Sequence, residues 1–321
     1  MNFITISGKK SNQTSNMTRT LQYTITANMA NKTILEFLTG KGISRQTIIA
    51  LKKQPESILV NQVWVHVTHR LCPGDLLTIT LKEDCSSAKI PPVCLPLHVL
   101  YEDEDILVIN KQADMPIHPS LHNYDNTLAN AVAYYYESRQ IPFIFRCINR
   151  LDRDTTGLTV IAKNQISASI LSEQMTRREI TREYLAITDG LVTPSEGIIA
   201  APIARKDGST IERCVDFTNG ERAITHYEVQ QYHSSHNFSL LRLWLETGRT
   251  HQIRVHMSYL GHPLLGDFLY HPPTGKDTEP KISRQALHAW RLTFTHPITG
   301  KLLTFQAPVP EDMLQLLEST V

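Results

Sequence analysis

A proline pair in the first third of the chain limits how the sequence can be organised. Pro91 and Pro92 follow the small residues near Ser86, and their fixed φ angles resist both helix and sheet. At 321 residues the chain is longer than one average domain. We therefore predict a linker at residues 85–96, between a small domain at 21–84 and a larger domain at 97–321.

The N-terminal tail, the lack of a long apolar stretch and the cysteines predict a cytoplasmic protein. Residues 1–20 are rich in Ser, Thr and Asn and lack an apolar run, so we expect a flexible tail and not a signal peptide. No stretch is long and apolar enough to cross a bilayer. The odd number of widely spaced cysteines, five in all, is typical of buried free thiols in a reducing cytosol. A monomer is the default expectation.

The small domain has the pattern of two helices followed by short strands. Ser44 is placed to cap a helix at Arg45–Lys52, and strand-like runs follow at 58–60, 63–67 and 76–80. Arg45 and Lys52 could face RNA phosphates, although basic residues on a helix more often form its solvated face. With 32 basic against 31 acidic side chains in the chain, any RNA site must be a local basic surface.

Near the middle of the chain, Asp152 lies between Arg150 and Arg153 in a short polar stretch that ends at Gly157. A carboxylate between guanidinium groups should stay ionised, ready to act as a nucleophile or a charge stabiliser. The alternative is a surface turn with ordinary ion pairs.

The segment from Asn149 to Gly157 resembles the signature of the RluA-type pseudouridine synthases, which isomerise uridine to pseudouridine in structured RNA. That signature reads His-Arg-Leu-Asp-Arg-x-Thr-Ser-Gly, and here Asn149 replaces the His and Thr156 replaces the Ser. The resemblance implies that Asp152 is the catalytic residue. It also implies that Arg150 fills the space that the target uridine leaves when it flips out of its stack.

A second segment of the chain matches the same family. Residues 181–188 alternate as a strand, with Leu185 and Ile187 on one face and Tyr184 on the other. Such a tyrosine is more often core or edge packing than catalytic. The stretch from Arg182 to Ala186 nevertheless resembles the family motif Lys-x-Tyr-x-Ala, which implies that Tyr184 is the active-site tyrosine and that Arg182 keeps the charge of the Lys.

The third match runs from Thr247 to His256 and continues from Gly261 to Asp267. We predict a helix with Thr250 as N-cap and Gly261 as its C′ residue. Arg254 would share a face with His251, either turned to solvent or placed to orient an acidic partner. The resemblance implies that Arg254 pairs with the catalytic carboxylate.

The likeness covers residues 97–317 and implies an α+β fold. The expected architecture is a pseudouridine synthase fold with a central mixed, largely antiparallel sheet and an active-site cleft. The small domain before it resembles the RNA-binding module named after ribosomal protein S-four. The expected RNA-contacting residues are Arg150, Arg153, Arg182, Arg249, His251, Arg45 and Lys52.

The expected activity is site-specific isomerisation of uridine in structured RNA, without a cofactor. Large-subunit ribosomal RNA is the leading substrate and transfer RNA the second. No metal is expected, because Pro119 argues against a helix that would bring His118 and His122 together. Asp152 could attack the ribose, attack the uracil ring, or help form a glycal.

Two other functions fit parts of the pattern. The chain could be a non-catalytic RNA-binding or ribosome-assembly factor. It could also be a carboxylate glycosidase, although no second carboxylate of matching context stands near Asp152.

Overall fold

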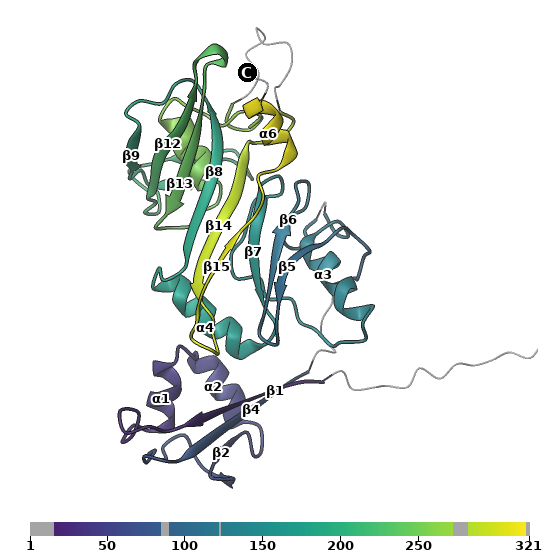
Figure 1. Ribbon diagram of the computed structural model, residues 1–321, viewed down its shortest axis with the longest axis vertical. Coiled ribbons are helices and arrows are strands. Elements are labelled where there is room, and N and C mark those ends of the chain that lie inside the picture. Colours follow the sequence, from purple (N-terminus) through teal and green to yellow (C-terminus); the bar gives the residue numbers. More distant parts are fainter. Residues whose placement is uncertain (1–15, 85–89, 122, 272–281, 319–321) are drawn as a thin grey trace, which may run out of the picture.

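The N-terminal part of the chain folds as a four-stranded antiparallel sheet with two helices on one face (Figure 1). The computed structural model describes residues 16–84, 90–121, 123–271 and 282–318. The strand order is β1-β4-β2-β3. The elements of this N-terminal unit are β1 (Asn16–Thr24), α1 (Ile34–Gly40), α2 (Arg45–Lys52), β2 (Ile58–Val60), β3 (Val63–Trp64) and β4 (Leu76–Asp84).

Local sequence fixes the ends of both helices in the unit. The Ser44 side chain accepts a hydrogen bond from the Thr47 amide and caps α2, as predicted. Thr33 and Glu36 form a reciprocal capping box at the start of α1. The strand predicted at residues 63–67 is shorter, because only Val63 and Trp64 pair with β2.

Strand β1 corrects the prediction of a flexible tail at residues 1–20. It begins at Asn16 and pairs with β4 along its whole length, from Asn16 opposite Asp84 to Thr24 opposite Leu76. Its polar residues look like loop sequence, but exposed and partly buried positions alternate along it as an edge strand requires. Residues 1–15 lie outside the described residues.

The rest of the chain is built on one nine-stranded sheet in the order β5-β6-β7-β14-β8-β13-β12-β9, with β15 added to β14. The only parallel pairing among these strands joins β7 to β14, so the predicted mixed, largely antiparallel sheet is confirmed. Its strands are β5 (His98–Glu102), β6 (Ile106–Lys111), β7 (Thr156–Ala162), β8 (Thr181–Asp189), β9 (Glu196–Ile199), β12 (Thr225–His233), β13 (Phe238–Leu245), β14 (Leu287–Thr295) and β15 (Leu302–Gln306). A separate hairpin contains β10 (Ile203–Arg205) and β11 (Arg213–Val215).

Helices cover both faces of this sheet. They are α3 (Leu128–Glu137), α4 (Gln165–Thr176), α5 (Gln252–Tyr259) and α6 (Glu311–Glu318), with the short 3-10 helix η1 (Ser234–His236) between β12 and β13. Helix α5 packs with Tyr184 and Ala186, whereas α6 packs with Leu185 and Ile187. The predicted alternation of β8 is therefore confirmed, and it places Tyr184 on the face that α5 covers.

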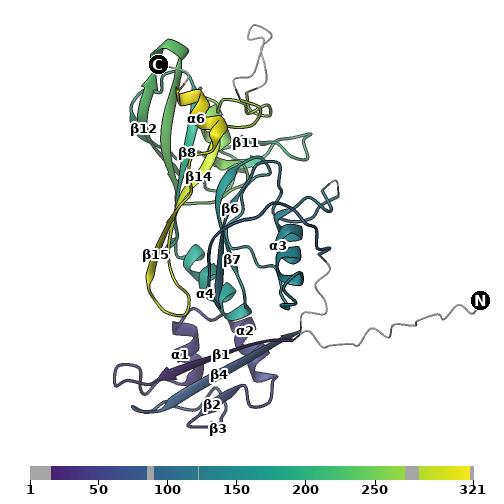
Figure 2. The ribbon, with the colours of Figure 1, turned by 45° about the vertical axis from the view of Figure 1, so that its right-hand side comes forward.

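The two units share a hydrophobic core across α4, which lies between the large sheet and helices α1 and α2 (Figure 2). Ile166 and Ile170 of α4 are buried within the core of the N-terminal unit. Arg19 of β1 makes a bidentate ion pair with Asp105, with nitrogen–oxygen distances of 2.9 and 2.7 Å. Apolar burial and a partly buried ion pair thus hold the units together.

The cysteines differ in burial from the prediction. Cys72 and Cys94 are exposed, Cys147 and Cys214 are half-buried, and all four are free. Cys72 lies in a turn whose amide donates to Asp75, which leaves the thiol at the surface. Cys85 lies outside the described residues. The longest helix, α4, has 12 residues, and no helix in the described ranges is long and apolar enough to span a bilayer.

Candidate active site

Asn149 anchors the polar stretch that contains Asp152. Its side chain is buried, donates to the Leu158 carbonyl at 2.9 Å and accepts from the Val160 amide at 2.9 Å. The amide group therefore pairs with β7 much as a backbone peptide would. This accounts for Asn at a position where the resemblance expects His, because one amide supplies both the donor and the acceptor.

The turn itself is held at the point where β7 meets β14. The Thr155 amide donates to the Asp152 carbonyl at 3.2 Å, and Leu151 is buried beneath the turn. Gly157 has φ of 111°, and a Cβ there would lie 2.2 Å from the Ala289 carbonyl oxygen. Only glycine can take this backbone conformation at so close an approach. Asp152 is thereby fixed at the seam between two strands.

Arg254 on α5 reaches Asp152 and is itself held by a second carboxylate. Its Nη1 lies 3.2 Å from Asp152 Oδ2, and its Nε and Nη2 donate to Asp267 at 2.7 and 2.8 Å. The Asp267 side chain is fully buried, the Arg254 side chain 8 % exposed and the Asp152 side chain 25 % exposed. Arg254 is therefore not a solvent-facing residue. Burial acts to lower the pKa of Arg254, but the hydrogen bonds and charge of Asp267, with those of Asp152, outweigh it and raise the pKa.

The start of α5 differs from the predicted cap at Thr250. His251 is the N-cap residue, in a left-handed conformation with φ of 58° and without a side-chain cap bond. The Gln252 side chain organises the turn instead, accepting from Thr247 Oγ1 at 2.8 Å and from the Arg249 amide at 3.0 Å. The other end is as predicted, since Gly261 has φ of 86° after the C-cap.

The left-handed turn also brings His251 toward the carboxylate. Its Nε2 lies 3.9 Å from Asp152 Oδ2, and its Nδ1 lies 2.8 Å from the Tyr270 hydroxyl. Burial lowers the pKa of His251. With the Tyr270 hydroxyl donating to Nδ1, the Nε2 proton faces Asp152.

Tyr184 is buried beside the same group, with 6 % of its surface exposed. Burial raises the pKa of its phenol, and the charge of Asp152 acts in the same direction against that of Arg182. No hydrogen bond from another described residue is among the influences on the pKa of the Tyr184 phenol, and the side chain lines the cleft. A neutral phenol on the wall of a cleft is free to interact with a bound base.

Asp267 and Tyr270 contact the predicted site residue Arg254, and neither of them was assigned a role from the sequence. Tyr270 lies under the Arg254 guanidinium at 5.0 Å, its hydroxyl accepts from the Arg213 amide at 2.8 Å, and burial raises its pKa to about 12. Asp267 stands at the end of the third match, but no role was assigned to it. No local pattern in the sequence pairs Asp267 with Arg254, which lies 13 positions earlier.

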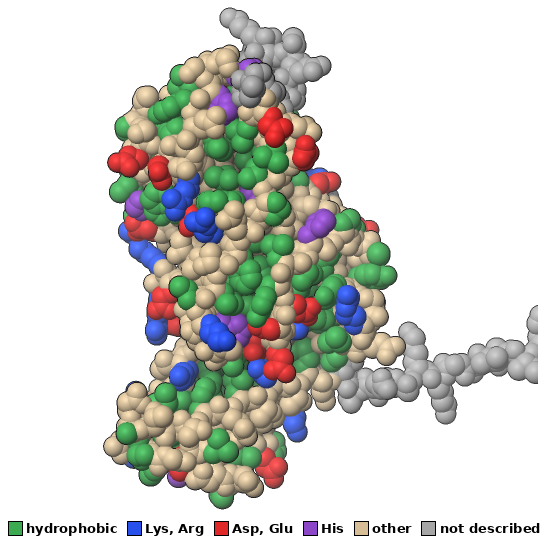
Figure 3. All heavy atoms as spheres, viewed as in Figure 1, with side chains coloured by type: hydrophobic (Ala, Val, Ile, Leu, Met, Phe, Trp, Pro, Cys, Tyr) green, Lys and Arg blue, Asp and Glu red, His purple; other side chains and the backbone are tan. Residues whose placement is uncertain are grey.

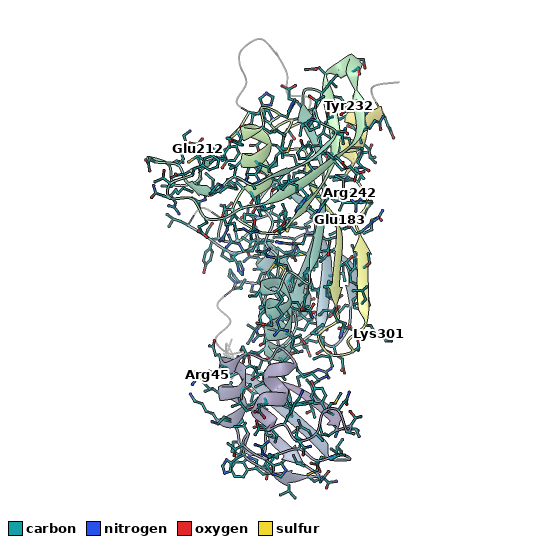
Figure 4. The ribbon with its side chains drawn as sticks, turned by 90° about the vertical axis from the view of Figure 1, so that its left-hand side faces the viewer. Arg45, Glu183, Glu212, Tyr232, Arg242 and Lys301 are labelled. Atoms are coloured by element: carbon teal, nitrogen blue, oxygen red, sulfur yellow. The ribbon has the colours of Figure 1, made fainter. Side chains whose placement is uncertain are left out.

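A cleft of about 680 Å³ opens beside Asp152. Of the predicted site residues, Asp152, Tyr184, Arg254, Arg150, Arg182, Arg249 and His251 line it. Arg153 does not line the cleft and pairs with exposed Asp114. Arg45 and Lys52 are exposed on α2 of the N-terminal unit, and Figure 4 labels Arg45 there. On the face shown in Figure 3, basic side chains lie beside acidic ones and do not form one positive field.

One group of side chains away from the cleft has the composition of a metal site. Ligand atoms of Asp103, Asp105 and His296 lie within 4.8 Å of one another. Their oxygens, however, accept from Arg19, Asn164 and other donors at the boundary between the units, which is the bonding of a structural cluster. Of the two predicted non-ligand histidines, His118 packs edge-on against Phe145, and His122 lies outside the described residues.

Comparison with known proteins gives a consistent result. The family model described as "RNA pseudouridylate synthase" matches residues 105–259. The chain is 39 % identical over 286 residues to "Uncharacterized RNA pseudouridine synthase YjbO" of Bacillus subtilis, covering 89 % of this chain and 98 % of the relative. It is 43 % identical over 273 residues to "Ribosomal large subunit pseudouridine synthase D" of Escherichia coli K12, covering 82 % of each. The solved structure of "Human RNA Pseudouridylate Synthase Domain Containing 1" matches with a TM-score of 0.56 and 27 % identity, over 72 % of this chain and 96 % of that one.

Proposed function

The chain belongs to the RNA pseudouridine synthase family, and on that premise we propose that it isomerises uridine in large-subunit ribosomal RNA, with Asp152 as the catalytic carboxylate. One observation carries the assignment of the residue. The Asp152 carboxylate is open to the cleft on one side and held by the fixed guanidinium of Arg254 on the other. The name of the Escherichia coli relative favours large-subunit ribosomal RNA over transfer RNA as substrate.

The reaction rearranges one nucleotide. The bond between ribose and the uracil nitrogen breaks, the base turns, and a bond forms from ribose to carbon 5 of the base. The proton on that carbon is lost, and the freed nitrogen takes up a proton. Because bonds are exchanged within one molecule, the step needs no oxidant and no external group. Asp152 can serve it by attacking the ribose, by attacking the uracil ring or by helping to form a glycal.

Arg254 positions the carboxylate for any of these routes. Its two bonds to Asp267 fix the guanidinium plane, so the third contact fixes the direction of Asp152 Oδ2. A carboxylate held in advance in one direction loses less freedom in the transition state than a mobile one.

Tyr184 is the residue proposed to contact the detached base. Its ring can lie against the uracil, and its hydroxyl can assist removal of the proton from carbon 5. The raised pKa keeps the phenol neutral, so it can assist by donating a hydrogen bond while the base turns and would not itself take the proton.

The target uridine must leave its stack before it can enter the cleft. Arg150 is exposed two residues before Asp152 and lines the cleft, so its planar guanidinium can fill the vacated space. Arg182, Arg249 and His251 extend this basic lining. The N-terminal unit, taken as an S-four-like module, would hold more distant RNA through Arg45 and Lys52, and Arg153 would add an outer contact.

The test is release of tritium from RNA labelled at carbon 5 of uridine. The wild-type protein should release it, and Asp152→Ala should abolish release while still binding the RNA. Asp154→Asn is the matched control, because it neutralises a carboxylate of the same turn that does not line the cleft, and it should leave release unchanged. Equal release by Asp152→Ala would overturn the assignment, and RNA binding without release by the wild type would favour a non-catalytic RNA binder.

A further inference from the structure

A carboxylate at the mouth of the cleft accepts hydrogen bonds from two arginines and a histidine, which come from two separate segments. Glu246 follows β13 and lines the cleft. It accepts from Arg178 Nη1 at 3.0 Å, from Arg222 Nη2 at 3.2 Å and from His226 Nε2 at 3.0 Å. The His226 hydrogen bond is the largest of the influences that lower the pKa of Glu246. The carboxylate is therefore an anion bound in a cationic site.

Arg178 stands at a position that usually selects glycine. It is the residue after the C-cap of α4 and has φ of 61°, in the left-handed region. Gly261 occupies the corresponding position after α5, with φ of 86°. A side chain is strained in this conformation, so an arginine there needs a reason beyond ending the helix. The left-handed turn directs its guanidinium to Glu246 at the cleft.

A second acid–base pair continues the same rim. Arg249, which lines the cleft, forms an ion pair with Glu221 and donates through Nε to the Arg222 carbonyl at 3.2 Å. The turn that contains Glu221 and Arg222 is thus tied to the segment that leads into α5. Arg222 does not itself line the cleft, but its Nη2 reaches Glu246, which does.

These rim pairs are open to solvent. The exposed fractions of the side chains are 49 % for Arg178, 57 % for Arg222 and 33 % for Glu246. Ion pairs between exposed groups add little to stability and exchange readily with other anions. A backbone phosphate diester offers two non-bridging oxygens to two guanidinium groups and carries one negative charge, as the carboxylate does.

We propose that Arg178 and Arg222 form a binding site for a backbone phosphate of the substrate RNA, and that Glu246 occupies this site until RNA displaces it. RNA that enters the cleft must compete with a carboxylate that is already in place. Glu246 thereby reduces the affinity for RNA that binds through charge alone. For the correct RNA, the contacts of the flipped uridine deeper in the cleft supply the free energy needed to displace Glu246.

The inference rests on the proposed function, but it is tested by binding alone. The parent protein is Asp152→Ala, which should not convert the RNA, and the probe is a fluorescein-labelled RNA hairpin with a uridine-rich loop. Its dissociation constant is measured by fluorescence anisotropy over a series of KCl concentrations. Glu246→Gln should bind about fivefold more tightly, because two arginines become free, and the slope of log K against log salt should become steeper by about one.

Glu173→Gln is the matched control. It also removes one acidic charge from a pair with an arginine, Arg177, but neither residue lines the cleft. It should change the affinity by less than about twofold. Arg222→Gln should weaken binding, and in the Glu246→Gln background it should cancel most of the gain.

Three results would overturn the proposal. Glu246→Gln could bind no more tightly than Glu173→Gln, the double variant could keep the full gain, or neither the parent nor Glu246→Gln could bind the hairpin. Thermal unfolding of each variant shows that it is folded, and Glu246→Asp provides a second variant that keeps the charge and shortens its reach. Loss of tritium release by the wild type would contradict the proposed function and leave this binding comparison unaffected.

Discussion

The floor and the mouth of the cleft use the same chemical pair, arginine with carboxylate, in opposite ways. On the floor, Arg254 is almost fully buried and bound to fully buried Asp267. At the mouth, Arg178 and Arg222 share Glu246 in contact with water. Breaking a buried pair costs about 3–5 kcal/mol, whereas an exposed pair contributes about 0–1 kcal/mol. Burial thus makes one pair a fixed support for Asp152 and leaves the other free to exchange.

The largest expected effect is on the floor. Arg254→Leu should abolish tritium release and lower the free energy of unfolding by about 3–5 kcal/mol, because Asp267 is left buried without its partner. Urea unfolding monitored by circular dichroism measures the second effect. The double variant Arg254→Leu with Asp267→Leu should regain most of the stability but none of the activity. A double variant as unstable as the single one would show that the pair does not act as a unit.

The next effect is a loss of folding stability at acid pH. Burial lowers the pKa of His288 to about 4, and the ring hydrogen-bonds Thr156 at 2.8 Å next to Gly157. The unfolded chain takes up the proton near pH 6.5, so unfolding binds a proton between about pH 6.5 and 4. Stability should therefore fall by about 3 kcal/mol as the pH falls through this window. Urea midpoints measured at each pH should show the loss, and His288→Gln should flatten it.

A smaller effect tests whether the charge of Asp267, and not only its shape, is needed to hold Arg254 in place. Asp267→Asn keeps the shape of the partner but weakens its hold on Arg254, so kcat should fall by about 10- to 100-fold with little change in KM. Steady-state tritium release over a range of RNA concentrations measures both constants. An increase in KM alone would place Asp267 in RNA binding and not in the support of Asp152.

The smallest expected effect on stability is at the mouth. Arg222→Gln should change the free energy of unfolding by less than about 1 kcal/mol, because its pair with Glu246 is exposed. Urea unfolding in parallel with Arg254→Leu provides the comparison. A loss as large as that of Arg254→Leu would remove the contrast between the two ends of the cleft.

The sequence predicted individual helices and strands better than it predicted the contacts that distant residues make with them. Ser44 as a cap and the alternation of β8 follow from local rules, and the structure has both. Strand β1 was missed because its polar residues pair with β4, about 60 positions away, and no local pattern contains that partner. The cap at Thr250 was wrong because the Gln252 side chain makes the bonds that a cap residue would make.

The sequence predicted the site residues that belong to a family motif, but not those whose place depends on tertiary packing. Asp152, Tyr184 and Arg254 were identified from three separate motifs, and all three line one cleft. Nothing in the spacing indicated that Asp267 holds Arg254 from behind or that Tyr270 lies under it. The arrangement at Glu246 was equally hidden, since only the folded chain brings Arg178 and the segment with Arg222 and His226 to the same carboxylate.

The parallel contact between β7 and β14 has a consequence for the protein during its synthesis. Thr156 and His288, paired across this seam, are separated by 132 positions in the chain, and Asp152 stands on the turn that leads into it. Such a distant pairing forms late, because a long loop must close first. A nascent chain that has not yet left the ribosome beyond β14 therefore lacks a formed catalytic centre. The protein should become able to modify RNA only after nearly all of it has been translated.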